Sequence, residues 1–88
     1  MALTKSQILA VAQGCHTSFH KGMHAPVNLF EVHVSHDGYI YLLPNHDRGI
    51  NYFFGDTLTF IGDYLNNHRV CWRVVVLYGS VAIKLLDD

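Results

Sequence analysis

The stretch LFEVHVSHDGYIYLL, residues 29–43, decides the fold of this 88-residue chain. Its first half alternates with a period of two, so that Phe30 and Val32 point to one side of a strand and the residues between them to the other. The pair Asp37-Gly38 then fits a two-residue turn with positive φ at both central positions. The apolar residues that follow predict a return strand, and the whole stretch therefore predicts a β-hairpin with one buried face.

A second hairpin is predicted at the C-terminal end. Residues 70–78 and 81–86 are rich in β-branched side chains, and Gly79-Ser80 between them suits a tight two-residue turn. The short aromatic run of residues 50–54 adds a possible third strand to the first hairpin.

Two other segments have helical spacing. Thr4 with Gln7 has the form of a capping box, which predicts a helix from about Lys5 that ends at Gly14 or Gly22.

A second helix is predicted after the N-cap residue Asp56, with Leu58, Ile61 and Leu65 as its inner stripe and its end near Asn67. The chain therefore reads αββ(β)αββ. This order predicts one α+β domain over residues 1–88, with two helices packed on one face of a mainly antiparallel sheet.

The composition excludes several classes of protein. Half of the residues are apolar and 15% are charged, which argues against disorder. The formal net charge of −1 provides no broad positive surface, and this disfavours nucleic acid as a partner. No apolar run approaches the roughly 20 residues of a membrane span, so we expect no membrane partner.

The N-terminal residues and the cysteines predict the compartment. Residues 1–5 lack a signal-peptide pattern, and this predicts a cytoplasmic protein, or one of the host cytoplasm if the chain is viral. Cys15 and Cys71 do not have the spacing of a disulfide framework. We expect both to be free thiols buried as small apolar side chains.

His16, His20 and His24 are four residues apart, and on a helix this spacing could present two imidazoles to one zinc ion. A metal site needs three or four ligands, and no HExxH motif or paired CxxC motif accompanies the histidines. His16 and His20 are therefore metal candidates with at most a two-ligand site, and a polar helix stripe is the preferred interpretation. We expect no cofactor. Without a nucleophile or phosphate-loop signature, the chain is not predicted to be an enzyme.

Aromatic and basic residues on the predicted strands suggest a second class of function. Tyr39, Tyr41, Trp72, Arg73 and Lys84 are the residue types that readers of single-stranded nucleic acid use for stacking and phosphate contact. The low net charge argues against this function, and the two tyrosines could instead face the core.

The C-terminal hairpin suggests self-association or a protein partner. Val74 and Val76 alternate with Val75 and Leu77, so both faces of this strand are apolar, yet two helices can cover only one face of the sheet. Long loops around Met23 and residue 50 could cover the other face. We favour a second copy of the chain, in a homodimer, or a partner protein.

The leading hypothesis is therefore a small intracellular protein-binding module that acts as an inhibitor or adaptor, as in phage-type antidefence proteins. Its candidate partner-binding residues are Val75, Leu77, Tyr39, Tyr41 and Arg73. The alternatives are a single-stranded nucleic-acid-binding domain and, third, a small metal-dependent enzyme.

Overall fold

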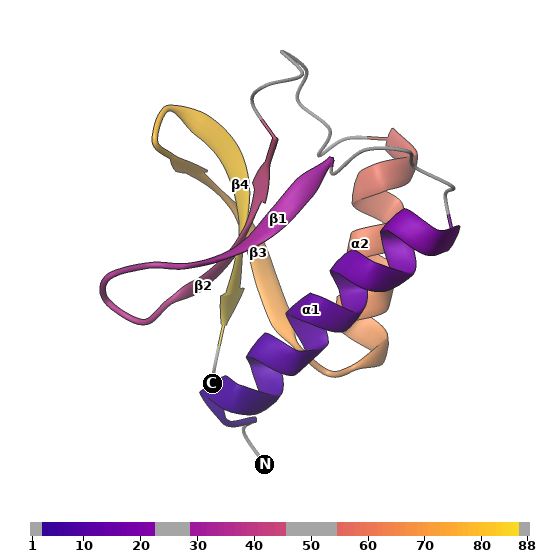
Figure 1. Ribbon diagram of the computed structural model, residues 1–88, viewed down its shortest axis with the longest axis horizontal. Coiled ribbons are helices and arrows are strands. Elements are labelled where there is room, and N and C mark those ends of the chain that lie inside the picture. The colour runs from indigo at the N-terminus through magenta and orange to yellow at the C-terminus, as the bar shows by residue number, and fades with distance from the viewer. Residues whose placement is uncertain (1–2, 23–28, 46–54, 87–88) are drawn as a thin grey trace.

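The computed structural model describes residues 3–22, 29–45 and 55–86 (Figure 1). Its elements, in chain order, are α1 (Lys5–Gly22), β1 (Phe30–Val34), β2 (Ile40–Pro44), α2 (Gly55–Asn67), β3 (Cys71–Leu77) and β4 (Ser80–Leu86). This order confirms the predicted α+β class. The expected strand over residues 50–54 lies outside the described residues.

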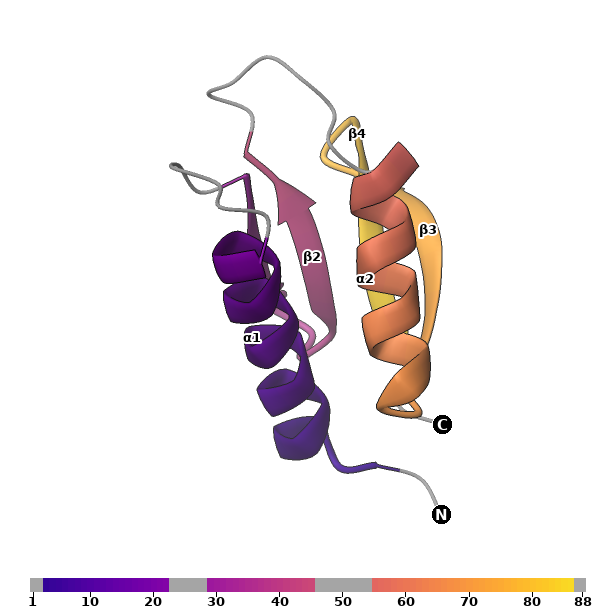
Figure 2. The same ribbon diagram turned by 90° about the vertical axis from the view of Figure 1, so that its right-hand side faces the viewer.

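All strand pairs of the sheet are antiparallel, and the strand order is β1-β2-β4-β3. Each hairpin therefore contributes one central strand and one edge strand, and the two hairpins meet where β2 pairs with β4. Figure 2 shows α1 and α2 side by side in opposite directions. Both helices cover the same face of the sheet, as predicted, and within the described residues neither is long and apolar enough to cross a membrane.

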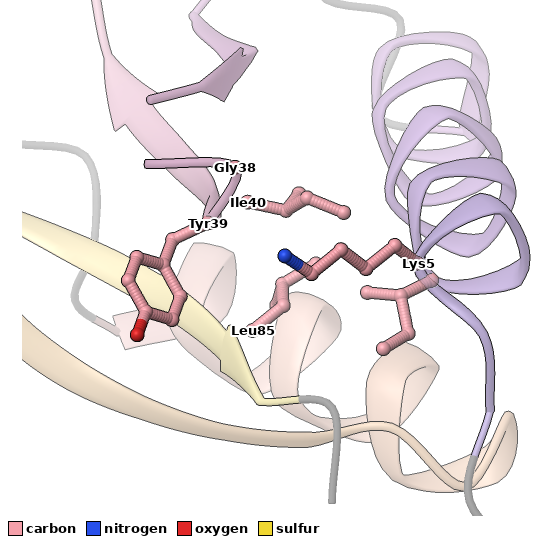
Figure 3. Close-up of a pocket in the computed structure, with 6 residues that line it drawn as sticks. Lys5, Gly38, Tyr39, Ile40 and Leu85 are labelled. Carbon is pink, nitrogen blue, oxygen red and sulfur yellow. The ribbon is translucent and has the colours of Figure 1, made fainter. Parts of the chain in front are cut away.

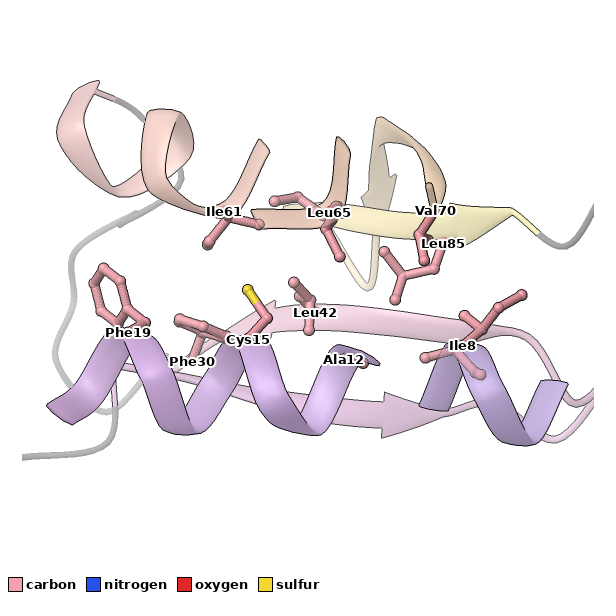
Figure 4. Packing of buried hydrophobic residues seen from close by; sticks show 12 residues of the cluster. Ile8, Ala12, Cys15, Phe19, Phe30, Leu42, Ile61, Leu65, Val70 and Leu85 are labelled. Atoms are coloured by element: carbon pink, nitrogen blue, oxygen red, sulfur yellow. The ribbon is translucent and has the colours of Figure 1, made fainter. Parts of the chain in front are cut away.

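The core lies between the two helices and this face of the sheet (Figure 4). Its largest fully buried side chains are Phe19, Phe30, Ile8, Leu42, Ile61, Leu65 and Ile83. Side chains three or four residues apart on the helices meet alternate side chains on the strands, because the two periods place one face of each element inward. The predicted inner stripe of α2 is buried at Ile61 and Leu65 and half-buried at Leu58, and α1 buries Ile8 on its inner side.

Helix α1 begins with the predicted capping box. The Thr4 N–H donates to Gln7 Oε1 over 2.8 Å, and the Gln7 N–H donates to Thr4 Oγ1 over 3.2 Å. The helix continues through Gly14 to Gly22. A Cβ atom at Gly14 would lie 2.6 Å from the hydroxyl oxygen of Tyr64, so the glycine leaves room for the close approach of α2.

Both hairpin turns differ from the predicted ones. At the first turn only Gly38 has a positive φ (87°). The Gly38 N–H donates to the Ser35 carbonyl over 2.9 Å, so this loop is a type I turn followed by a left-handed glycine. The second turn is one residue earlier than predicted: Tyr78 and Gly79, with φ of 53° and 76°, form its centre, and Ser80 begins β4.

The end of α2 connects directly to β3. Arg69 has a φ of 61°, and the Val70 N–H donates to the Leu65 carbonyl over 2.9 Å. This is a Schellman motif, in which the left-handed position is usually glycine. Val70 is buried against the core beyond this turn, so the motif sets the direction in which β3 leaves the helix.

Candidate functional site

The strand register divides the sheet into a helix-covered face and a second face, which we call the helix-free face. Phe30, Leu42 and Ile83 belong to the buried core on the helix-covered face. The alternate positions point the other way. The helix-free face carries Glu31, His33, Tyr41, Leu43, Cys71, Arg73, Val75, Leu77, Ser80, Ala82, Lys84 and Leu86.

The five predicted partner-binding residues share this face. Arg73, Val75 and Leu77 lie on it along β3, and Tyr41 lies on it in β2. Tyr39 stands at its end, where the Lys84 ammonium lies 4.1 Å from the centre of the tyrosine ring. Neither tyrosine belongs to the core between the helices and the sheet. Tyr41 is buried on the helix-free face, and Tyr39 lies at the end of the sheet between Lys84 and Lys5 of α1.

A row of polar side chains crosses the middle of the helix-free face. His33 on β1 is opposite Tyr41 on β2, Tyr41 is opposite Lys84 on β4, and Lys84 is opposite Arg73 on β3. Directly opposite residues on one face have side chains about 5 Å apart at Cβ. The sheet therefore places two cations beside each other and next to two aromatic rings.

Tyr78 extends this row from the β3–β4 turn. Its ring makes an edge contact with His33, with 6.0 Å between the ring centres, and it is 74% exposed. His33 Nε2 is a buried nitrogen without a hydrogen-bond partner among the described residues. Tyr78 is not among the residues predicted to bind a partner, because the pattern of residues 70–78 predicts a strand through it, although a residue followed by glycine between two strands is also a turn signal.

The centre of the helix-free face is not exposed, although neither α1 nor α2 covers it. Tyr41 is only 9% exposed and Ala82 is fully buried. Tyr41 lies near the His33 ring, and the contact between His33 and Tyr78 joins β1 to the far turn. Long side chains of the face itself thus cover its middle, and the surface open to a partner is formed by its outer residues.

A narrow hollow lies between the start of α1 and the end of the sheet, on the helix-covered side (Figure 3). It is lined by Lys5, Ile8, Gly38, Tyr39, Ile40 and Leu85, and it has room for no more than about one water molecule. Figure 3 shows the Lys5 side chain extending from the start of α1 across the hollow. The hollow is too small for a substrate or a cofactor.

The structure gives His20 a role in the fold. Its Nδ1–H donates to the His16 carbonyl over 2.7 Å, and its Nε2 accepts the Leu29 N–H over 2.9 Å. The side chain thereby ties the end of α1 to the residue before β1. Burial lowers the pKa of His20, with a further lowering from the nearby His16 and an opposing effect from the backbone hydrogen bond.

These contacts bear on the metal candidates. A metal at His20 would have to displace one of its two hydrogen bonds, because each ring nitrogen is already engaged. Within residues 3–22, 29–45 and 55–86, no three histidine, cysteine or acidic side chains are placed to hold a metal ion. His24 lies outside the described residues, and the absence of a metal stays a prediction.

The two cysteines have different environments. Cys15 is buried as predicted, and burial raises the pKa of its thiol to about 12. A thiol of this pKa is protonated at neutral pH and does not act as a nucleophile. Cys71 is exposed on the helix-free face, so the prediction of a second buried thiol is wrong. Cys71 follows the buried Val70 in the sequence. Because successive side chains of a strand point to opposite faces, the Cys71 side chain points away from the core.

Strand β3 is the least buried element of the sheet, although its sequence CWRVVVL is strongly apolar. No residue of β3 is buried. On the helix-covered face, Trp72 packs against α2 at Gly62, where a Cβ atom would lie 2.8 Å from the indole ring. Beyond this contact Val74 is 48% and Val76 is 76% exposed, and Figure 1 shows that this part of β3 runs away from α2.

Comparisons with protein-family models, curated proteins and solved structures find no match to this chain.

Proposed function

We propose that the protein is a protein-binding module and that the helix-free face is its binding surface. The observation that carries this proposal is the gathering of Tyr39, Arg73, Val75 and Leu77 on one face that neither α1 nor α2 covers. Tyrosine and arginine are enriched in protein interfaces, and the half-buried Val75 and Leu77 add apolar area that association can bury. Tyr78 adds a large exposed ring at the rim.

The charges of the face indicate the chemistry of the partner. Arg73 and Lys84 are adjacent on β3 and β4, and Glu31 is the one acidic side chain on the described part of this face. The face is thus more positive than the whole chain, whose formal net charge is −1. A partner with an apolar patch flanked by carboxylates would match both features.

Binding without chemistry is consistent with an inhibitor or adaptor, as phage antidefence proteins are, and we assign the protein to this broad category and not to the enzymes. The thiol of Cys71 is exposed and free, which suits a reducing compartment such as the cytoplasm, or the host cytoplasm for a viral chain.

The test uses a charge substitution on each side of the sheet. Val75→Asp places a carboxylate within the helix-free face, and Val34→Asp is the control, because Val34 is 50% exposed on the other face. We expect a partner captured by the unaltered protein to bind Val34→Asp equally and Val75→Asp at least about tenfold more weakly, since a buried unpaired charge costs more than 1.4 kcal/mol. Thermal melting must show that both variants fold. A folded Val75→Asp protein that binds with unchanged affinity would contradict the proposal.

A second candidate function is binding of single-stranded nucleic acid. The observation in its favour is the position of Lys84 above the Tyr39 ring, next to Arg73. Two phosphate contacts would give a slope of about −1.4 for the logarithm of affinity against the logarithm of salt concentration. Titration of labelled oligonucleotides at several salt concentrations measures this slope. An affinity that Arg73→Glu and Lys84→Glu leave unchanged would exclude this surface as the nucleic-acid site.

A further inference from the structure

Within the described residues, the outer edge of β3 is an unpaired strand edge. In the order β1-β2-β4-β3, β3 pairs with β4 on one side only. Among the residues that the structure describes, none pairs with its other side. An edge strand of this kind presents a row of free backbone N–H and C=O groups that can pair with another strand.

The hairpin geometry identifies these free groups. Tyr78 and Gly79 form a two-residue turn in which both φ angles are positive, and such a turn is flanked by a hydrogen-bonded pair, here Leu77 and Ser80. In an antiparallel ladder hydrogen-bonded pairs alternate with pairs whose backbone groups point outward. The outward groups of β3 therefore belong to Trp72, Val74 and Val76.

The edge of β3 also lacks the features that prevent edge pairing. Proteins protect exposed edges with lysine, proline, bulges or very short strands. The seven residues of β3 include one charged side chain, Arg73, and no proline or glycine. The other edge strand, β1, has five residues with Glu31 and His33 among them, and α1 packs against it.

We infer that two copies of this chain pair antiparallel through β3 and form one continuous eight-stranded sheet. The two-fold axis passes through Val74, so that Val74 is opposite the partner's Val74. This register pairs all seven residues of β3, and it makes hydrogen-bonded pairs of the residues whose backbone groups are free. Three such pairs with two bonds in each give about six hydrogen bonds.

The exposed edge of β3 is complementary to itself, so the strand that pairs with it is β3 of a second copy of the chain. On the helix-covered side, Trp72 is opposite the partner's Val76, and Val76 is opposite the partner's Trp72. The exposed valines of β3 are thus covered by apolar side chains. On the helix-free side Arg73 is opposite the partner's Val75, so no two charges are directly opposite. A symmetric dimer requires this kind of match between a patch and itself.

The extent of the contact sets its strength. A seven-residue strand is about 23 Å long, and a contact limited to two strands and their side chains lies at the small end of specific interfaces. The dimer therefore forms as the concentration rises and dissociates on dilution. Its formation does not depend on the helix-free face binding another protein.

The test compares the two edges of the sheet. Val76→Lys places a cation at the exposed β3 edge, and Val34→Lys does the same at the β1 edge on the same face. Light scattering over a concentration series should show the mass doubling for the unaltered chain and for Val34→Lys. For Val76→Lys the dissociation constant should rise about 100-fold, tenfold for each copy. Melting curves at low concentration check that both variants fold.

A monomer at all concentrations would overturn the inference. So would a dimer that Val76→Lys leaves intact, because its interface would lie elsewhere, for example on the helix-free face. Hydrogen exchange gives an independent measurement. The amides of Trp72, Val74 and Val76 should exchange more slowly as the concentration rises, while those of β1 should not change. Equal rates at low and high concentration for these three amides would contradict pairing through β3.

Discussion

The two halves of the molecule have the same order of elements, one helix followed by two strands, but they differ in how they bury their edge strand. In the first half, Phe30 on β1 is fully buried against α1 and the core. In the second half, β3 has the corresponding edge position in the sheet and contains no buried residue. Helix α2 packs on β3 at Trp72, near the start of the strand, and Figure 1 shows the strand leading away from this helix toward the β3–β4 turn.

This difference shows that the apolar character of a strand does not by itself predict its burial. Residues 71–77 are apolar except for Arg73, yet Val74 and Val76 are exposed at the edge of the sheet. In β2, by contrast, the central position places Ile40, Tyr41 and Leu42 inside. Apolar residues that the monomer leaves exposed are the ones that association would bury.

The largest expected effect separates the two edge strands. Phe30→Ala should lower the free energy of unfolding by about 3–5 kcal/mol, because a buried aromatic ring is lost and a cavity remains. Val76→Ala should lower it by about 0.5 kcal/mol or less, since the side chain is exposed. Denaturant titration at a concentration low enough for the monomer measures both. Similar losses for the two variants would remove the distinction between the halves.

Helix α2 differs from β3, the strand that follows it, because α2 has a buried inner stripe. Leu65 is fully buried, and Leu65→Ala should cost about 2–5 kcal/mol. An unchanged denaturant midpoint would show that α2 contributes little to the core.

The next effect concerns the contact that holds β3 to α2. Gly62→Ala would place a Cβ atom 2.8 Å from the Trp72 ring, which must then move. We expect a net loss of about 1–2 kcal/mol, because overpacking outweighs the gain in helix propensity. Gly22→Ala is the control, since a Cβ atom there meets nothing within 4 Å, and it should not destabilise. Melting temperatures compare the two, and equal stability would mean that Trp72 is free to move.

A smaller effect of opposite sign is expected at the connection between α2 and β3. Arg69→Gly should raise the free energy of unfolding by about 0.5–1 kcal/mol, because glycine adopts the φ of 61° without strain. Arg73→Gly, in the extended strand β3, is the matched control and should destabilise. The measurement is again the denaturant midpoint. A loss of stability in Arg69→Gly would indicate that its side chain contributes more than the backbone strain costs.

The last prediction is the pH dependence of the connection from α1 to β1. The folded-state pKa of His20 lies below its ordinary value of 6.5, so the unfolded chain binds more protons. The stability from neutral His20 is therefore present in full above about pH 6.5 and is lost as the pH falls through the lower folded-state pKa. Protonation would also turn Nε2, which accepts the Leu29 N–H, into a donor.

Melting curves between pH 5 and 8 for the unaltered chain and His20→Gln measure this contribution, and pH 5 and 8 bracket the titration range of histidine. The loss of stability on acidification should be smaller in His20→Gln. An identical pH profile for the two proteins would assign the acid sensitivity to other histidines.

Several parts of the fold follow from local patterns. The capping box at Thr4, the inner stripe of α2 and the alternation in residues 29–43 each depend on neighbours within one element, and all three are confirmed. The sequence predicts both hairpin turns in the correct segments but with the wrong geometry, because Asp37 does not take a positive φ and Tyr78 does. Sterics alone disfavour a left-handed tyrosine, so the turn depends on the pairing of β3 with β4.

The sequence determined one part of the candidate site, and the tertiary structure determined the other. Alternation along each strand determined by itself that Arg73, Val75 and Leu77 share one face and that Tyr39 and Tyr41 share one face. Only the tertiary structure decided that these two faces are the same one, because the order β2-β4-β3 joins the hairpins through Lys84. The exposure of β3 was likewise decided by strand order and by the direction of β3 relative to α2, since burial depends on what packs against a residue and not on its own hydrophobicity.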